Sequence, residues 1–92
     1  MDNGLCRQVA VINKLGLHAR AATRLAQLAT TFDASITLHL NEQSASADSI
    51  LGLLMLQGCQ GRDITVCSQG PDAQAALDAI CELFASRFDE AE

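Results

Sequence analysis

The sequence predicts an α+β domain in which helices cover one face of an antiparallel sheet. Some segments alternate apolar and polar residues, as strands do, and others repeat apolar residues every three to four positions, as helices do. These segments follow one another as strand, helix, strand, strand, helix, strand and helix. A chain of 92 residues, 49% of them hydrophobic, has material for one core. We therefore expect a single two-layer domain over residues 1–92, with four antiparallel strands, three helices on one sheet face and the other face open to water.

The first half of the chain supplies two strands and one helix. The segment "CRQVAVIN" places Val9 and Val11 on one face, and the turn at residues 13–16 ends it. A helix is predicted from Ala19 to near Thr31, because apolar residues recur at helical spacing: Ala22, Leu25, Ala26 and Ala29. The segment "ASITLHLN" then alternates as a half-buried strand, with its apolar face formed by Ile36, Leu38 and Leu40.

The second half continues the same pattern. After a turn at residues 41–42, "QSASA" predicts a short return strand, and Ser49 is a candidate N-cap for a short helix that Gly58 would end. The segment "DITVCS" predicts the fourth strand. Pro71 is expected at the first position of the last helix, whose buried stripe is Leu77, Ile80, Phe84 and Phe88. The residues from about 89 to 92 are expected to form a solvated acidic tail.

Composition argues against several classes of function. The chain has no Trp or Tyr and a net charge of −5, which disfavours binding to nucleic acid. The longest apolar run, "ILGLLML", is too short to cross a bilayer, and no signal peptide opens the chain, so we expect a cytoplasmic protein that does not bind membranes. The four cysteines are not spaced for a metal site and are expected to be reduced thiols: Cys6, Cys59, Cys67 and Cys81.

The heptapeptide "GLHARAA" holds the residues that favour a chemical role. His18 precedes the first helix, and none of the residues before Ala19 is a strong oxygen cap. The first N–H groups of the helix are therefore expected to be free, which together with the helix dipole predicts an anion site. Arg20 adds donors suited to phosphate. The alternative is an exposed histidine at a helix start beside an unrelated arginine.

The segments "NKLGLHARAATRLAQLA", "SADSILGLLML" and "GRDITV" resemble the HPr family, the small histidine phosphocarriers of the bacterial phosphotransferase system. The likeness covers about residues 5 to 90 and is strongest to the nitrogen-branch member. It implies that His18 accepts phosphate on Nδ1 from enzyme I and donates it to an enzyme IIA. Arg20 and the backbone N–H groups of Ala19, Arg20 and Ala21 would hold the phosphoryl oxygens. No metal or other cofactor is implied, and a monomer is expected.

The sequence departs from the family at one point, because Ala21 stands where the family usually has proline. Proline is tolerated in the first helical turn since it lacks an N–H that has no partner there. Alanine returns this donor to the anion site. We therefore expect tuned phosphate stability or transfer rate and not loss of function.

The resemblance also indicates a second modification site and a docking surface. Ser49 matches a serine that a dedicated kinase phosphorylates in some members, although helix capping is the favoured explanation for it. Ile50, Leu51 and Leu54 match the docking patch of the family, and Leu53 and Leu56 are assigned to the core. Thr23, Arg24 and Gln27 join the patch in one interpretation and are ordinary solvated residues in the other.

The leading hypothesis is thus a phosphocarrier, a transfer protein and not a free-standing enzyme, in the nitrogen-related branch. A sugar-branch carrier is the nearest alternative. A regulatory module whose phosphorylation state switches partner binding is a second. A small hydrolase with His18 as general base is a third, and it lacks a nucleophile or acid partner in the sequence.

Overall fold

The computed structural model describes residues 4–90, and its elements follow the predicted order. The strands are β1 (Leu5–Ala10), β2 (Ser35–Leu40), β3 (Gln43–Ser46) and β4 (Asp63–Gln69). The α-helices are α1 (Ala19–Ala29), α2 (Ile50–Met55) and α3 (Ala73–Ala85), and a short 3-10 helix, η1, covers Arg87–Asp89. The predicted order of strands and helices is therefore confirmed.

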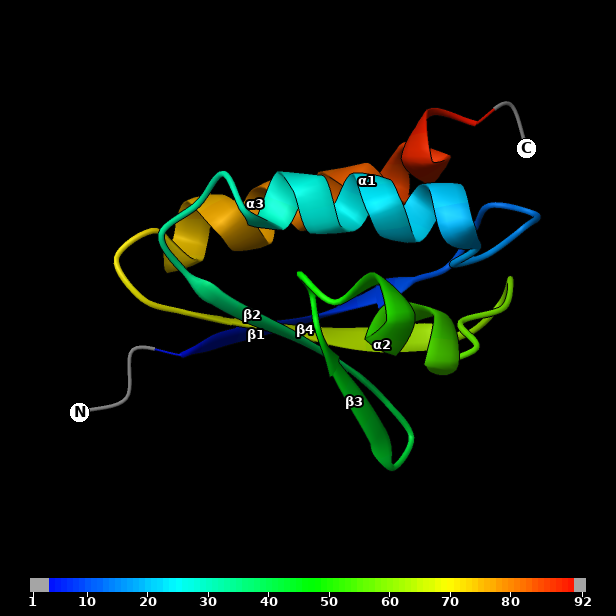
Figure 1. The fold of residues 1–92 in the computed structure, drawn as a ribbon, viewed down its shortest axis with the longest axis horizontal. Coiled ribbons are helices and arrows are strands. Elements are labelled where there is room, and N and C mark those ends of the chain that lie inside the picture. The colour runs from blue at the N-terminus through cyan, green and yellow to red at the C-terminus, as the bar shows by residue number, and fades with distance from the viewer. Residues whose placement is uncertain (1–3, 91–92) are drawn as a thin grey trace.

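The four strands form one antiparallel sheet in the order β1-β4-β2-β3. Figure 1 shows α1 and α3 side by side across one face of this sheet, and α2 contacts β3 and α1. Residues 11–18 join β1 to α1, and the start of α1 lies at one end of the molecule. The short η1 helix, at the other end of the sequence, lies at this same end.

The core lies between the sheet and the helices. The predicted apolar faces of β2 and β4 are buried, with Leu38, Ile64 and Val66 fully enclosed. Strand β1 differs, because Val9 is only half-buried and the buried Val11 lies just after the strand ends. Leu25 of α1, Ile80 of α3 and the α2 residue Leu53 complete this core. Complete burial of one such side chain stabilises the fold by roughly 1.5–3 kcal/mol. The predictions that Leu53 and Leu56 belong to the core are confirmed, since they are 0% and 4% exposed.

Two helix boundaries differ from the prediction. Helix α3 begins at Ala73 with Asp72 as N-cap, so Pro71 precedes the helix and is not its first residue. The reason is a tertiary contact, because Asp72 binds the backbone of Asp33 through both its N–H and its carboxylate, at 3.0 and 2.7 Å. Helix α2 ends at Met55, and the left-handed residue that follows is Gln57, with φ 56°, and not Gly58.

The C-terminal segment is the largest departure from the sequence prediction. Phe88 is buried as predicted, but α3 ends at Ala85 and Phe88 is not on that helix. Arg87, Phe88 and Asp89 adopt left-handed backbone angles, with φ of 57°, 55° and 61°. This turn reverses the chain so that Asp89 and Glu90 contact α1 and the turn before it. The predicted solvated tail is therefore wrong for Glu90, whose side chain is 14% exposed, whereas Asp89 remains exposed to solvent although it is ion-paired. Residues 91–92 lie outside the described part of the chain.

The expectation of four reduced cysteines is also corrected. Cys6 and Cys67 form a disulfide, whereas Cys59 and Cys81 are free thiols. The two bonded residues are 61 positions apart in sequence, and only the pairing of β1 with β4 sets them directly opposite each other. Their spacing in the sequence carries no sign of this register.

Candidate functional site

The position of His18 is set by the turn that joins β1 to α1. Gly16 has a left-handed φ of 65°, and a Cβ atom there would lie 2.4 Å from the carbonyl oxygen of Gly58. This carbonyl accepts a hydrogen bond from the N–H of Leu17 at 2.9 Å, and the Leu17 side chain is buried. Only glycine fits this approach, because any other side chain would clash with backbone atoms. The turn is thus held against the backbone of Gly58 by Gly16 and Leu17, the two residues immediately before His18.

His18 is the N-cap of α1, and its own imidazole performs the capping. Nδ1 accepts a hydrogen bond from the backbone N–H of Arg20 at 3.3 Å. The expectation that the first-turn N–H groups are all free is therefore wrong for Arg20. Ala19 and Ala21 also belong to this first turn, where backbone N–H groups have no acceptor within the helix. The nitrogen predicted to carry phosphate thus already faces the predicted anion site.

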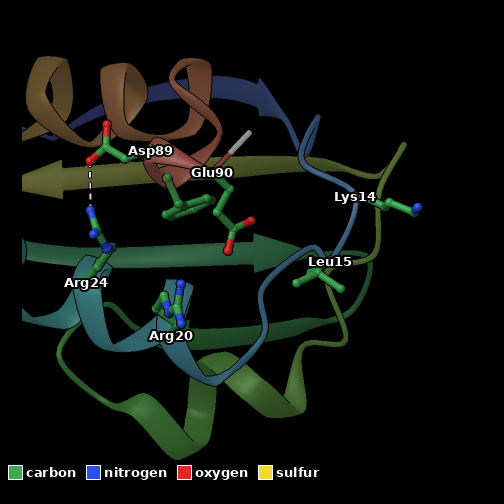
Figure 2. Close-up of a pocket in the computed structure, with 7 residues that line it drawn as sticks. Lys14, Leu15, Arg20, Arg24, Asp89 and Glu90 are labelled. Atoms are coloured by element: carbon green, nitrogen blue, oxygen red, sulfur yellow. Dashed lines mark hydrogen bonds and ion pairs between the residues drawn. The ribbon is translucent and has the colours of Figure 1, made fainter. Parts of the chain in front are cut away.

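Charged side chains surround an open hollow beside the start of α1. Its lining includes three cationic residues, Lys14, Arg20 and Arg24, and the acidic residues Asp89 and Glu90. In Figure 2, Arg20 and Arg24 project from α1, whereas the Lys14 side chain points away from the other charged groups. Arg24 is held by an ion pair with Asp89 at 2.7 Å. The chain has only six Lys and Arg residues in total, so half of its cationic side chains line this one hollow. A protein of net charge −5 thereby gathers three positive side chains at the start of α1, together with two acidic ones.

Glu90 is the site residue that sequence reasoning missed. Its carboxylate pairs with Nε2 of His18, and its other oxygen accepts a hydrogen bond from the Asn13 amide at 2.9 Å. The same amide also donates to the carbonyl of Gly16 at 2.9 Å, and Asn13 is fully buried. His18 and Glu90 are 72 positions apart, and an acidic residue near a chain end carries no signal of such a contact.

The environment of Glu90 favours its charged form. The hydrogen bond from Asn13 is the main reason why the pKa of Glu90 lies below that of an ordinary glutamate. Burial opposes this effect, while the hydrogen bond and charge of His18 and the charge of Arg20 add to it. The carboxylate is therefore ionised at neutral pH and acts as an acceptor only.

The predicted docking residues differ in what surrounds them. Leu51 is 70% exposed and Ile50 and Leu54 are partly exposed, which agrees with a surface role. Arg24 and Gln27 are also exposed, whereas Thr23 is half-buried and donates to the carbonyl of Ala19. Two further exposed apolar residues were missed: Leu15 and Met55, at 67% and 66%. Met55 lies four residues after Leu51, so helical spacing already indicated a shared face.

Ser49 caps α2, as its sequence position predicted. Its hydroxyl oxygen accepts a hydrogen bond from the N–H of Gly52 at 3.1 Å. This geometry accounts for a serine at this position without any modification.

Within residues 4–90 no helix is long and apolar enough to cross a membrane. The same residues contain no group of three or more His, Cys, Asp or Glu side chains arranged to hold a metal ion.

Comparisons with known proteins agree on one family. A family model described as "PTS HPr component phosphorylation site" matches residues 5–86. The chain is 61% identical to "Phosphocarrier protein NPr" of Shewanella violacea, over 92% of this chain and 93% of that protein. It is 44% identical to "Phosphocarrier protein HPr" of Cupriavidus necator, over 96% and 99% of the two chains.

A solved structure extends this likeness to three dimensions. The crystal structure of HPr-C-His from Thermoanaerobacter tengcongensis superposes with a TM-score of 0.91 at 31% identity, covering 96% of this chain and 99% of that one. The family match spans the turn before α1, the helix start and His18. The chain is thus similar along almost its whole length to phosphocarriers named NPr and HPr, and it belongs to the HPr family of phosphocarriers of the phosphotransferase system (PTS).

Proposed function

We propose that Nδ1 of His18 accepts a phosphoryl group from the phosphohistidine of enzyme I and passes it to a histidine of an enzyme IIA. The observation that carries this proposal is the contact of Nδ1 with the N–H of Arg20 at the N-terminus of α1. A nucleophilic nitrogen here lies next to the donors that stabilise a phosphoryl group once it arrives.

The transfer step follows from this geometry. The lone pair of Nδ1 attacks phosphorus, a new N–P bond forms, and the electron pair of the old N–P bond returns to the ring nitrogen of the donor. Nδ1 then no longer accepts from Arg20, so that backbone N–H turns to a phosphoryl oxygen. The N–H groups of Ala19 and Ala21 and the guanidinium of Arg20 bind the remaining charge. The reverse sequence delivers the group to enzyme IIA.

The exposed apolar residues around α2 support a docking role in this exchange. Ile50, Leu51, Leu54 and Met55 face solvent on one short helix, and Leu15 lines the hollow beside Arg20. Thr23, Arg24 and Gln27 extend this surface along α1. Such exposed apolar groups are typical of a protein that binds partners transiently. We further propose that the carrier acts as a cytoplasmic monomer and that Ser49 serves as a cap unless a serine kinase is present.

Phosphorylation by enzyme I and phosphoenolpyruvate tests the proposal directly. We expect one phosphoryl adduct by intact mass spectrometry, labile in acid and stable in base, and no adduct on His18→Ala. Arg20→Ala should slow transfer by about tenfold or more, because a charge-assisted contact to the phosphoryl group is lost. An unmodified wild-type protein would overturn the proposal, and an unchanged rate in Arg20→Ala would remove Arg20 from the mechanism.

The branch is tested with purified partners of both kinds. If the protein belongs to the nitrogen-related branch, transfer from the nitrogen-branch enzyme I and onward to its enzyme IIA should have a higher kcat/KM than transfer with the sugar-branch pair. The opposite preference would favour the sugar-branch alternative. If the protein is instead a regulatory module, His18→Ala should bind and regulate its partners as well as the wild type does.

A further inference from the structure

Two neighbours of His18 define the state of its ring. The carboxylate of Glu90 contacts Nε2, and the backbone N–H of Arg20 contacts Nδ1. An ionised carboxylate only accepts hydrogen bonds, and a backbone N–H only donates them. The neutral ring satisfies both contacts in one tautomer, with its proton on Nε2 and its lone pair on Nδ1.

The Glu90 carboxylate is itself held in place. Its second oxygen accepts from the Asn13 amide at 2.9 Å, and that amide is anchored to the Gly16 carbonyl, also at 2.9 Å. The side chains of Glu90 and His18 are 14% and 25% exposed, so water has restricted access to the pair. Asn13, Glu90 and His18 thus form a chain of contacts in which each member orients the next.

The backbone is shaped to bring Glu90 to this position. Three consecutive residues before it, Arg87 to Asp89, are left-handed, a conformation that L-amino acids rarely adopt in succession. Phe88, 1% exposed, anchors the turn by packing edge-to-face on Phe84 with ring centroids 4.9 Å apart. Such backbone strain is concentrated at functional sites, where the surrounding structure maintains it.

We propose that Glu90 is a positioning residue for phosphoryl transfer, which keeps the His18 proton on Nε2 so that Nδ1 is the nucleophile. This inference rests on the proposed function of His18. When Nδ1 forms its bond to phosphorus, the ring becomes positively charged, and the adjacent carboxylate compensates that charge. When the bond breaks again, its electron pair returns to Nδ1. The proton remains on Nε2 throughout, so the ring leaves as neutral imidazole in the reverse step.

A comparison of Glu90→Gln with Glu90→Ala distinguishes this role from a structural one. In the glutamine variant, one of the two oxygens becomes an NH2 group. At the Asn13 end it would face another donor, and the Asn13 amide cannot reverse without placing its oxygen against the Gly16 carbonyl. The NH2 group therefore faces His18 and donates to Nε2, which favours the ring proton on Nδ1 at the expense of the hydrogen bond from the Arg20 N–H. The alanine variant removes the contact and leaves the ring unconstrained.

Nitrogen-15 NMR of the histidine ring in the unphosphorylated protein reads the tautomer, at a pH above about 8, where imidazole is neutral. We expect Nε2–H in the wild type, a shift toward Nδ1–H in Glu90→Gln, and a mixture in Glu90→Ala. The matched control is Asp89→Asn, which removes one negative charge from the adjacent residue without touching His18, and it should keep the wild-type tautomer. The backbone amide spectrum verifies that each variant is folded.

Transfer rates provide the second measurement. Because glutamine imposes the wrong tautomer, Glu90→Gln should accept phosphate about tenfold more slowly than wild type or worse, and more slowly than Glu90→Ala. A structural role predicts the reverse order, since alanine removes more of the side chain. Retention of Nε2–H in Glu90→Gln, or transfer in that variant at least as fast as in Glu90→Ala, would overturn the inference. Failure of the proposed function is distinct, because the wild-type protein would then not be phosphorylated at all.

Discussion

Each ring nitrogen of His18 faces a different kind of group, and that difference organises the site. Nδ1 accepts from the backbone N–H of Arg20, which lies only two residues further along the chain, so this contact is local in the sequence. Nε2 faces a carboxylate that comes from the opposite end of the sequence. Each left-handed residue in the turn that delivers this carboxylate costs about 1 to 2 kcal/mol. Burial of Phe88 and the contacts of Asp89 and Glu90 offset this cost.

The lowered pKa of Glu90 predicts how stability depends on pH. A carboxyl group whose pKa is lower in the folded state stabilises the fold above the unfolded-state pKa, near pH 4.3 for glutamate at about 25 °C. This contribution is lost as the pH falls through the folded-state pKa. Glu90→Gln should therefore be less stable than wild type at pH 7 by about 1 kcal/mol or more, and the difference should shrink below about pH 4.

Urea unfolding followed by far-ultraviolet circular dichroism, from pH 3 to pH 7, measures this difference in a chain without Trp or Tyr. Stability curves of wild type and Glu90→Gln that run parallel across this range would contradict the assignment.

At the scale of elements, α2 combines a structural and a surface role within six residues. Leu53 faces the core, whereas Leu51 and Met55 face solvent. Ser49 begins the helix through its hydroxyl, and loss of such a cap costs about 1 kcal/mol. A phosphate on Ser49 would replace this cap beside the exposed apolar residues, so stability and partner binding would change together.

Leu51 provides the test of the surface role. Leu51→Ser should raise the KM for enzyme I by about tenfold. The substitution removes an apolar side chain from the docking surface, and loss of an important interface contact costs more than about 1 kcal/mol of binding free energy. Stability should change little, because the side chain is 70% exposed in the free protein. Steady-state transfer kinetics and thermal unfolding measure the two effects. Leu5→Ser, a similar change at the far end of β1, is the control, and an equal KM effect in both variants would argue against the docking surface.

At the scale of the whole molecule, the disulfide links the first strand to the fourth. Cys6 and Cys67 lie opposite each other on β1 and β4, and the bond joins residues that are 61 positions apart in the sequence. Such a link stabilises a small domain by about 2 to 4 kcal/mol, mainly by restricting the unfolded chain. The bond lies on the sheet, away from the end of the molecule that holds His18. We therefore expect it to affect the stability of the fold and not the transfer of phosphate.

Reduction of this bond is therefore expected to lower Tm by about 10 °C or more without abolishing phosphorylation of His18. Thiol titration of the unreduced, unfolded protein should detect Cys59 and Cys81 only, and four thiols after reduction. Cys67→Ser should reproduce the reduced stability. Four reactive thiols before reduction would contradict the bond.

The sequence by itself determined the order of elements, the buried faces of β2 and β4, the core leucines of α2 and the position of His18 at a helix start. These features depend on neighbours within a few residues, which periodicity and capping preferences record. Only the tertiary structure decided the Glu90–His18 contact, the left-handed turn around Phe88, the bond between Cys6 and Cys67 and the late start of α3. Each of these joins residues far apart in sequence, where the gain from packing and hydrogen bonding overrides the local preference of the chain.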